Sequence, residues 1–263
     1  MLLSDLALYL IDTFTDKIFH GQNTAVCLLA EELNDELLVA IALENKYPET
    51  VFVRLQHKQW YVRWFNAQGE IYGTGHGSIA VAAVLFEQYH LKSDTLILNN
   101  ALGQTTIHRD NDRFYLEYPI TPATLGIVTS PLSQYFSIQP LEIWQNGPDL
   151  IAYFEHQADV ENLNIQVDAL KNLVAGALIA TAPSTEVDIY SRCFLPRLAG
   201  YEETATPAVY PRLLRFWQQK TPKNQYKAFQ GLMRRSEIHV MSREHYIWVG
   251  GHCRCYFRGE LLL

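Results

Sequence analysis

The stretch that decides the fold is residues 66–86, NAQGEIYGTGHGSIAVAAVLF. Its pattern predicts the end of a strand, a loop with three glycines, and an apolar helix. Gly73, Gly75 and Gly77 permit positive φ angles or a close approach of the backbone to a ligand. The stretch therefore predicts either a binding loop or a tight turn, and its residues alone leave both open.

Ser78 is the predicted N-cap of a helix over residues 79–86. A helix N-terminus carries unpaired N–H groups and the positive end of the helix dipole, so it can hold an anion. His76 stands at this position as a possible proton donor or acceptor. The alternative is that His76 only hydrogen-bonds its own loop.

The composition predicts an ordinary globular protein. The chain has 263 residues, of which 48% are hydrophobic and 19% charged, and this length favours two domains. No apolar run approaches the length of a membrane span. The first ten residues, MLLSDLALYL, carry Asp5 and lack a basic region, which indicates a first strand and not a signal peptide. The expected location is the cytoplasm, and no membrane partner is expected.

Charge is unevenly distributed. The net charge of −7 argues against nucleic acid as a partner. Residues 197–258 contain 11 Lys/Arg and four Asp/Glu, whereas the rest of the chain contains 10 and 24. This asymmetry is compatible with a basic pocket for an anionic small molecule, with two halves that attract each other, or with a solvated basic face.

The four cysteines match no zinc spacing and are predicted to be reduced and buried. The histidines show no HxxxH or HxH motif, so no metal site is predicted. No GxGxxG follows a predicted strand, so no dinucleotide loop is predicted. We therefore expect no cofactor.

The first 117 residues predict about seven strands and two helices. Asn34 is the predicted cap of the first helix, with Leu37, Leu38, Ile41 and Ala42 facing inward. The expected strands are residues 6–11, 24–29, 50–54, 59–65, 95–98, 104–108 and 113–117.

Residues 119–122, PITP, are the predicted domain boundary. Beyond it the plan repeats in architecture, without a repeat in sequence. Strands are expected near 124, 143 and 151, at 176–181, 187–194, 236–241 and 246–249, and around 256. Helices are expected at 131–136, near 167–173, and around Leu213–Trp217, with a loop at 196–206.

Three segments of the first half resemble the phenazine biosynthesis isomerase (PhzF-like) family. Residues 11–29, IDTFTDKIFHGQNTAVCLL, are similar to that family's opening DxFTxxpFxGNpaAV. Residues 48–53, PETVFV, resemble SETxFV, and residues 73–80, GTGHGSIA, resemble LCGHATLA.

Three segments of the second half follow in the family's order. Residues 194–208, FLPRLAGYEETATPA, resemble FxPxxGxxEDPaTGSA. Residues 230–236 and 249–251 resemble the closing QG…GRpS…VGG pattern. The resemblance extends nearly from end to end, and the chain is identified as a member of this family.

The resemblance implies an α+β fold of the diaminopimelate epimerase type. Two similar domains, residues 1–118 and 119–252, would each wrap a mixed, barrel-like sheet around a central helix, and a last strand at 253–263 would return to the first domain. The active site would lie in the cleft between them. The helices after Ser78 and Pro207 would be the two central ones, with N-termini facing across that cleft.

By the same resemblance, Glu49 is the catalytic acid/base, and its apolar neighbours would raise its pKa by desolvation. The alternative is that Glu49 only caps a turn at the start of an edge strand. His76 would assist proton transfer or orient the substrate. Glu203, in place of the family's usual aspartate, would hydrogen-bond the substrate or His76.

The implied substrate-binding residues are Asn23, Gly75, Gly77, Ser78 and Thr206. Gly75 and Gly77 would offer backbone N–H groups to a substrate carboxylate, and Asn23 would shape the pocket. Cysteine racemases of this fold use two opposed thiols, but Thr74 and Ala208 occupy those neighbourhoods here, which excludes a two-thiol racemase.

The second anion site departs from the family pattern. TGSA is replaced by TPAV at residues 206–209. Pro207 lacks the N–H that an anion would use, and Ala208 lacks the hydroxyl. A later start of the following helix is also expected, because Pro211 fits only a first turn.

The sequence therefore predicts a cofactor-independent isomerase or epimerase that moves a proton on a small anionic metabolite. A homodimer is expected from the resemblance. The rival hypotheses are a non-catalytic descendant that binds a ligand or partner, and a component that serves only in assembly.

Overall fold

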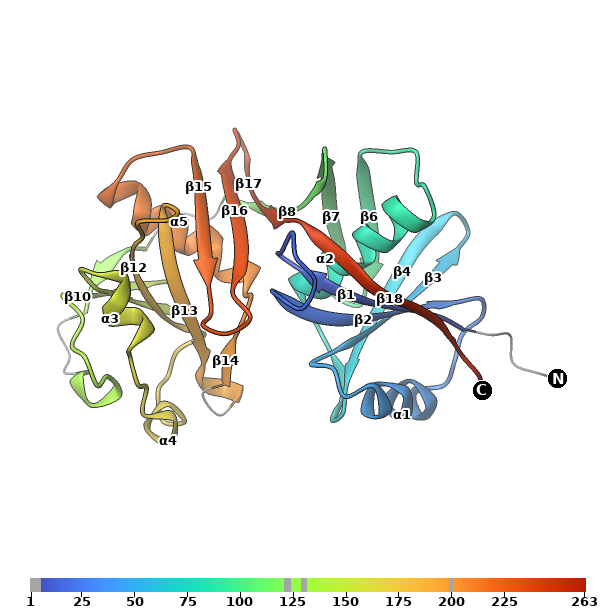
Figure 1. Ribbon diagram of the computed structural model, residues 1–263, viewed down its shortest axis with the longest axis horizontal. Helices are drawn as coiled ribbons and strands as arrows, with labels where there is room; N and C mark the ends of the chain where they lie inside the picture. The colour runs from blue at the N-terminus through green and yellow to red at the C-terminus, as the bar shows by residue number, and fades with distance from the viewer. Residues whose placement is uncertain (1–5, 121–123, 129–131, 199–200) are drawn as a thin grey trace. The chain divides into compact units, whose positions relative to one another are not determined.

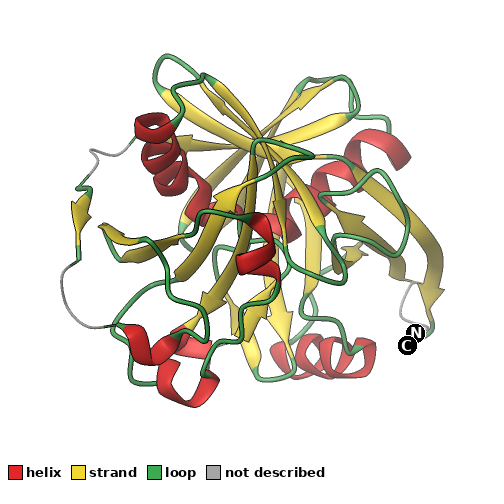
Figure 2. Cartoon of the chain, turned by 60° about the vertical axis from the view of Figure 1, so that its left-hand side comes forward, coloured by secondary structure: helices red, strands yellow, loops and turns green. Residues whose placement is uncertain are grey.

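A computed structural model describes residues 6–120, 124–128, 132–198 and 201–263. The chain divides into two compact units, one formed by residues 1–117 and 250–263, the other by residues 118–249. The boundaries predicted from the sequence lay one and three residues further along, at 118/119 and 252/253. Strands predominate over helices in the part of the chain that is described (Figure 2).

The first unit is a mixed sheet (Figure 1). β1 (Leu6–Thr13) pairs antiparallel with both β2 (Gln22–Leu29) and β18 (Cys253–Leu261). β2 is parallel to β3 (Thr50–Gln56), which pairs antiparallel with β4 (Gln59–Asn66). β4 pairs antiparallel with the short β5 (Gly69–Ile71) and runs parallel to β6 (Thr95–Asn100), which continues into the antiparallel strands β7 (Gly103–Asp110) and β8 (Arg113–Pro119). The C-terminal strand thus pairs with the first strand of the chain.

Two helices pack in the first unit in different ways. α1 (Asp35–Asn45) buries one face, Leu38, Ile41 and Ala42, in a cluster with Phe52 and Phe65. α2 (Gly75–Ala83) is buried at every position from His76 to its end and contacts β1, β2, β3, β7 and β18. A helix that is apolar on all sides is stable only when it is enclosed, so α2 is the central helix of this unit.

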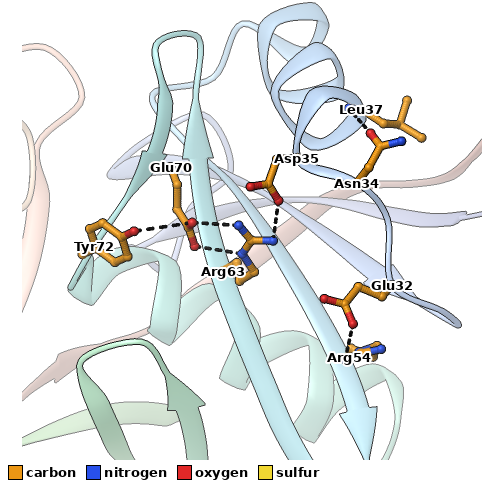
Figure 3. A network of polar contacts seen from close by, with 8 residues as sticks. All are labelled: Glu32, Asn34, Asp35, Leu37, Arg54, Arg63, Glu70 and Tyr72. Atoms are coloured by element: carbon orange, nitrogen blue, oxygen red, sulfur yellow. Dashed lines mark hydrogen bonds and ion pairs between the residues drawn. The ribbon is translucent and has the colours of Figure 1, made fainter.

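The start of α1 follows the prediction. The side chain of Asn34 accepts a hydrogen bond from the backbone N–H of Leu37 at 2.9 Å. Figure 3 shows how the helix is tied to the sheet: Arg63 donates to Asp35 at the start of α1 and makes a bidentate pair with Glu70 of β5. These contacts are partly exposed, so each contributes little to stability.

The sequence placed the start of the central helix too late. α2 begins at Gly75, with Thr74 in the N-cap position, and Ser78 lies inside the first turns, where its hydroxyl donates to the Thr74 carbonyl at 2.9 Å. Of the three loop glycines, only Gly73 has a positive φ, 73°. Ser78 is therefore not the N-cap. After Ala83 the helix continues as a single π-helical turn, η1 (Val84–Gln88).

The second unit repeats the pairing order of the first. β10 (Glu142–Asn146) and β11 (Asp149–Tyr153) are antiparallel, β11 and β12 (Leu178–Pro183) are parallel, and β12 and β13 (Ile189–Leu195) are antiparallel. β13 pairs antiparallel with the short β14 (Tyr201–Glu203) and runs parallel to β15 (Gln225–Gln230), which pairs antiparallel with β16 (Ser236–Ser242). The predicted architectural repeat is present strand by strand, with β5 and β14 in equivalent places before α2 and α5.

The remaining helices and two further strands lie wholly or mostly in the second unit. They are β9 (Gly126–Ile127), η2 (Ser133–Tyr135), α3 (Gln157–Glu161), α4 (Val167–Leu170), η3 (Pro196–Leu198), η4 (Pro207–Val209), α5 (Tyr210–Lys220) and β17 (Tyr246–Gly251). The predicted helix at 131–136 is only the 3-10 turn η2, and residue 131 lies outside the described residues. The sequence did not predict β5, β14, β15 or α3. No helix in the described ranges is long and apolar enough to cross a membrane.

Candidate functional site

Glu49 is held at the end of the loop that leads into β3. Its carbonyl accepts a hydrogen bond from the Ala25 N–H of β2 at 3.3 Å, and Thr50 continues the parallel register opposite Ala25. The side chain is buried, with 1% of the residue exposed. A buried carboxyl is rare without a partner, so its surroundings are informative.

His76 is the partner that the structure brings to Glu49. It is the second residue of α2, and its Nε2 lies 3.1 Å from Glu49 Oε1. His76 is itself 8% exposed. The two predicted catalytic groups of the first half, 27 residues apart in sequence, are therefore in contact.

Burial raises the pKa of Glu49 to about 8. Desolvation is the dominant cause, since the charged carboxylate loses its hydration in this environment. The nearby hydroxyls of Thr74 and Thr24 oppose this effect and lower the pKa by a smaller amount. At neutral pH the Glu49 carboxyl thus retains a proton that an exposed glutamate would lose.

Several buried polar atoms around Glu49 lack a hydrogen-bond partner of good geometry among the described residues. They are both carboxyl oxygens of Glu49, the hydroxyls of Thr24 and Thr74, and the indole Nε1 of Trp64. Leaving such an atom unsatisfied costs about 1–3 kcal/mol. Buried polar atoms of this kind are normally satisfied by bound water or by a ligand, and in native proteins they occur mainly at functional sites.

The N-terminus of α2 adds positive potential at the same place. The first N–H groups of an α-helix have no acceptor within the helix, and α2 begins at Gly75. These groups favour a negative charge nearby. The arrangement can therefore hold an anion and exchange a proton with it.

Ser78 and Asn23 are the remaining predicted side chains of the first half. Ser78 is turned back onto Thr74 and is buried. Asn23 lies in β2 opposite Asp12 of β1 and is partly buried. Asp12 is fully buried and accepts a hydrogen bond from the Phe19 N–H at 2.5 Å, which shapes the loop before β2.

Glu203 and Thr206 belong to the second unit and contact each other. The Thr206 hydroxyl donates to Glu203 Oε2 at 2.9 Å. Gln230 completes the cluster, because its side-chain amide donates to the Thr206 hydroxyl at 3.1 Å and to the Glu203 carbonyl at 2.9 Å. The cluster joins β14, β15 and the start of η4.

The sequence at Pro207 changes how the second helix begins. A 3-10 turn, η4, precedes α5, which starts only at Tyr210 with Pro211 as its second residue. The expected late start is therefore confirmed. Thr206 occupies the N-cap position of η4 and makes no capping hydrogen bond with its side chain.

Three of the four cysteines are buried. Cys27, Cys193 and Cys253 are buried, Cys255 is partly buried, and all four are free thiols. Burial raises the pKa of Cys27 to about 12 and raises that of Cys193 further. A thiol with such a pKa is a poor nucleophile or base at neutral pH.

Sequence reasoning missed three residues of these two clusters: Thr24, Trp64 and Gln230. Trp64 lies in a run of alternating strand residues, where a tryptophan is expected to be core. Thr24 and Gln230 lie within the quoted family segments but carried no separate signal. Only the structure, with the neighbouring strands paired, shows that the indole N–H of Trp64 is buried without a hydrogen-bond partner.

Comparison with known proteins agrees with this architecture. The sequence model of the PhzC-PhzF family, described as phenazine biosynthesis-like protein, matches residues 11–254. An uncharacterized isomerase of Halalkalibacterium halodurans is 27% identical over 260 residues, which cover 97% of this chain and 98% of that protein.

Solved structures extend the likeness to the fold. A PhzF family protein of Enterococcus faecalis superposes with a TM-score of 0.92 at 25% identity, covering 98% of this chain and all of that one. A hydroxyproline epimerase of Agrobacterium vitis, with a TM-score of 0.60 at 11% identity, covers 100% of this chain and 94% of its own, and shows the fold alone.

Proposed function

Because the chain belongs to the phenazine biosynthesis-like family, we propose that it is a cofactor-independent isomerase or epimerase. In this proposal a proton moves on and off a carbon atom of a small anionic metabolite. Glu49 gives and takes that proton, and His76 assists the transfer. The uncharacterized isomerases among its relatives support the reaction class.

The contact between Glu49 and His76 carries the proposal. Moving a proton on carbon needs an acid/base whose pKa is near the working pH and a means of stabilising the anion that forms. Glu49 has a pKa of about 8, and the first turn of α2 supplies N–H groups beside it. Gly75, Gly77 and Ser78 are the proposed substrate contacts of this turn, with Asn23 at the side.

In the proposed step, the neutral Glu49 carboxyl donates its proton to one carbon of the substrate, and the same carboxylate then recovers a proton from another. His76, whose Nε2 lies 3.1 Å away, can donate a hydrogen bond to the Glu49 carboxylate in the interval. An unpaired Glu49 carboxylate would be costly in its buried position, so the imidazole lowers that cost.

The test is hydrogen exchange with solvent. The protein is incubated in D2O with a panel of small carboxylates that includes proline, 4-hydroxyproline and methylitaconate, and mass spectrometry follows deuterium in each compound. We expect incorporation into at least one compound, and none with Glu49→Gln. Unchanged incorporation by Glu49→Gln would refute the role of Glu49.

A second candidate is a non-catalytic descendant that binds a ligand or partner. Two observations favour it: Pro207 offers no N–H, and the Thr206 hydroxyl is already engaged with Glu203. In this case Glu203 and Thr206 form a structural cluster and not a substrate contact. Homodimerisation is a further proposal from the family resemblance, and sedimentation measures it directly.

A further inference from the structure

A pocket of about 310 Å³ lies in the first unit, beside the loop that leads into α1 and over strands β3, β4 and the end of β6. Two arginines, Arg54 and Arg63, contribute to its lining. Small-molecule sites are concave, mainly apolar and equipped with a few polar groups, and this volume lies at the lower end of their range. The apolar part of the lining comes from Leu29, Leu33, Leu38 and Phe52.

The pocket lies on the opposite face of the sheet from Glu49. A Cβ added at Gly77 of α2 would meet both Glu49 and Trp64, so these two side chains face α2. Tyr61 is three residues before Trp64 in β4, and the alternation of side chains along a strand places it on the other face. Arg54 is paired with Tyr61 across the strands, and both line the pocket. The pocket is therefore separate from the proposed catalytic group.

The two arginines of the pocket differ in how far their donors are used. All three nitrogens of Arg63 donate to carboxylates, two of them to Glu70. Arg54 uses Nη2 alone, which lies 3.1 Å from Glu32 and donates to Gln56 at 2.9 Å. Figure 3 shows Arg54 with Glu32, apart from the group around Arg63. Neither Nε nor Nη1 of Arg54 donates a hydrogen bond to a described residue.

Glu32 is a weak partner for Arg54. The Glu32 side chain is 69% exposed, whereas that of Arg54 is 23% exposed. An exposed ion pair contributes little to stability, because two long side chains must be ordered and water and salt screen their charges. A ligand carboxylate in the place of Glu32 could accept from Nη2 together with Nη1 or Nε, the two parallel bonds that a guanidinium offers. Such a ligand can therefore displace Glu32 at low cost.

The volume and the charges of the pocket define the class of ligand. A cavity of about 150 Å³ can hold benzene, so 310 Å³ has room for one ring and a short carboxyl arm. Glu32 and Glu70 also line the pocket, and they repel a phosphate dianion more strongly than a monocarboxylate. We propose that this pocket is a second ligand site, which binds a small monocarboxylate with an apolar ring through Arg54. The site does not depend on the proposed function.

Titration with 3-phenylpropionate tests the site, and the backbone amide signals of Asn99 and Asn100, which line the pocket, report binding by NMR. We expect saturable shifts of both signals, and at least about tenfold weaker binding of the neutral 3-phenylpropanamide. Arg54→Gln should weaken binding of the carboxylate at least about tenfold, because charge-assisted hydrogen bonds are lost. Glu32→Gln removes the competing carboxylate and should tighten binding about two- to fivefold, the range of an exposed ion pair.

Arg109→Gln is the matched control and should bind like the native protein. Arg109 also has one carboxylate partner, Asp94 at 2.9 Å, and is not among the residues that line the pocket. The absence of saturable shifts at Asn99 and Asn100 up to the solubility of 3-phenylpropionate overturns the proposal. Equal binding of the acid and the amide, or unchanged binding by Arg54→Gln, also overturns it.

Glu32→Gln keeps the test decisive even where Arg54→Gln does not fold, because Glu32 is an exposed side chain. Weaker or unchanged binding by Glu32→Gln contradicts the proposal, since no other site gains affinity from this change. Shifts at Gly75 and His76 alone would place the carboxylate at the proposed catalytic site and overturn the second site. Deuterium exchange that survives Glu49→Gln would refute the proposed function and leave this pocket standing.

Discussion

Glu49 Oε1 lies 3.1 Å from His76 Nε2, and both residues are almost wholly removed from solvent. The pair joins the start of β3 to the first turn of the central helix. Because the dominant influence on Glu49 is desolvation, the pair has consequences for stability as well as for chemistry. These can be measured before any substrate is known.

Glu49→Gln should make the protein more stable at alkaline pH. The pKa of Glu49 rises from 4.5 to about 8 on folding, so the folded state binds the extra proton between these values. The stabilisation is fully present below pH 4.5 and is lost as pH rises through 8. With about 1.4 kcal/mol per pKa unit, the gain of the variant over the native protein should grow by on the order of 4 kcal/mol between pH 5 and 9.

Urea unfolding at both pH values measures this gain. Glu44→Gln is the control, because Glu44 is exposed on α1, and it should show no such pH dependence. An equal effect of Glu49→Gln at both pH values would mean that Glu49 titrates normally.

His76→Asn should slow proton exchange and leave the fold intact. General acid–base groups typically contribute about 10²–10⁴-fold to rate, so the deuterium incorporation rate should fall by this order. His108 provides the control, since its Nε2 lies 2.7 Å from Glu117 Oε2 in a similar His–Glu pair away from a helix N-terminus. Loss of exchange in His108→Asn as well would point to a general effect on stability.

Arg192→Lys should destabilise the protein by about 3 kcal/mol or more. Arg192 is 6% exposed, makes a bidentate pair with Glu202 of β14, and donates to the carbonyls of Val160 and Leu163. A lysine keeps the positive charge but cannot make all four bonds, so buried carbonyls or the Glu202 carboxylate lose a donor.

Thermal and urea unfolding follow the effect of Arg192→Lys. Because Arg192 pairs with Glu202 of β14, hydrogen exchange at this strand should also increase. Arg235→Lys, at the exposed pair with Glu186, is the control and should cost less than about 1 kcal/mol. Equal costs in the two variants would contradict the structural role of Arg192.

The elements with regular alternation were predictable from sequence, and the irregular ones were not. Strands such as β3 and β4 show clear runs of strand formers, and Asn34 followed by Asp35 and Glu36 marks the start of α1. β5 and β14 have only three residues each, too few for a period to be recognised. β15, QYKAFQ, ends on Gln230, which is buried. From the sequence alone, a glutamine is expected on the polar surface.

The candidate site, too, was predictable from the sequence only in part. Glu49 and His76 were predicted by the family resemblance, and their contact follows from the way β3 and α2 are enclosed. The start of the helix was predicted four residues too late, because glycines at 75 and 77 indicate a loop when only local propensity is considered.

Pro207→Gly combined with Ala208→Ser tests whether the second half can regain an anion site. Glycine returns a backbone N–H before α5 and serine adds a hydroxyl, and hydrogen bonds to a charged group contribute about 1.5–3 kcal/mol each. We expect the double variant to bind the carboxylate that exchanges deuterium at least tenfold more tightly, measured by calorimetry. Ala208→Ser alone separates the hydroxyl from the N–H and should give a smaller gain. If neither variant gains affinity for any carboxylate in the panel, Glu203, Thr206 and Gln230 have become a closed structural cluster, and the non-catalytic candidate is favoured.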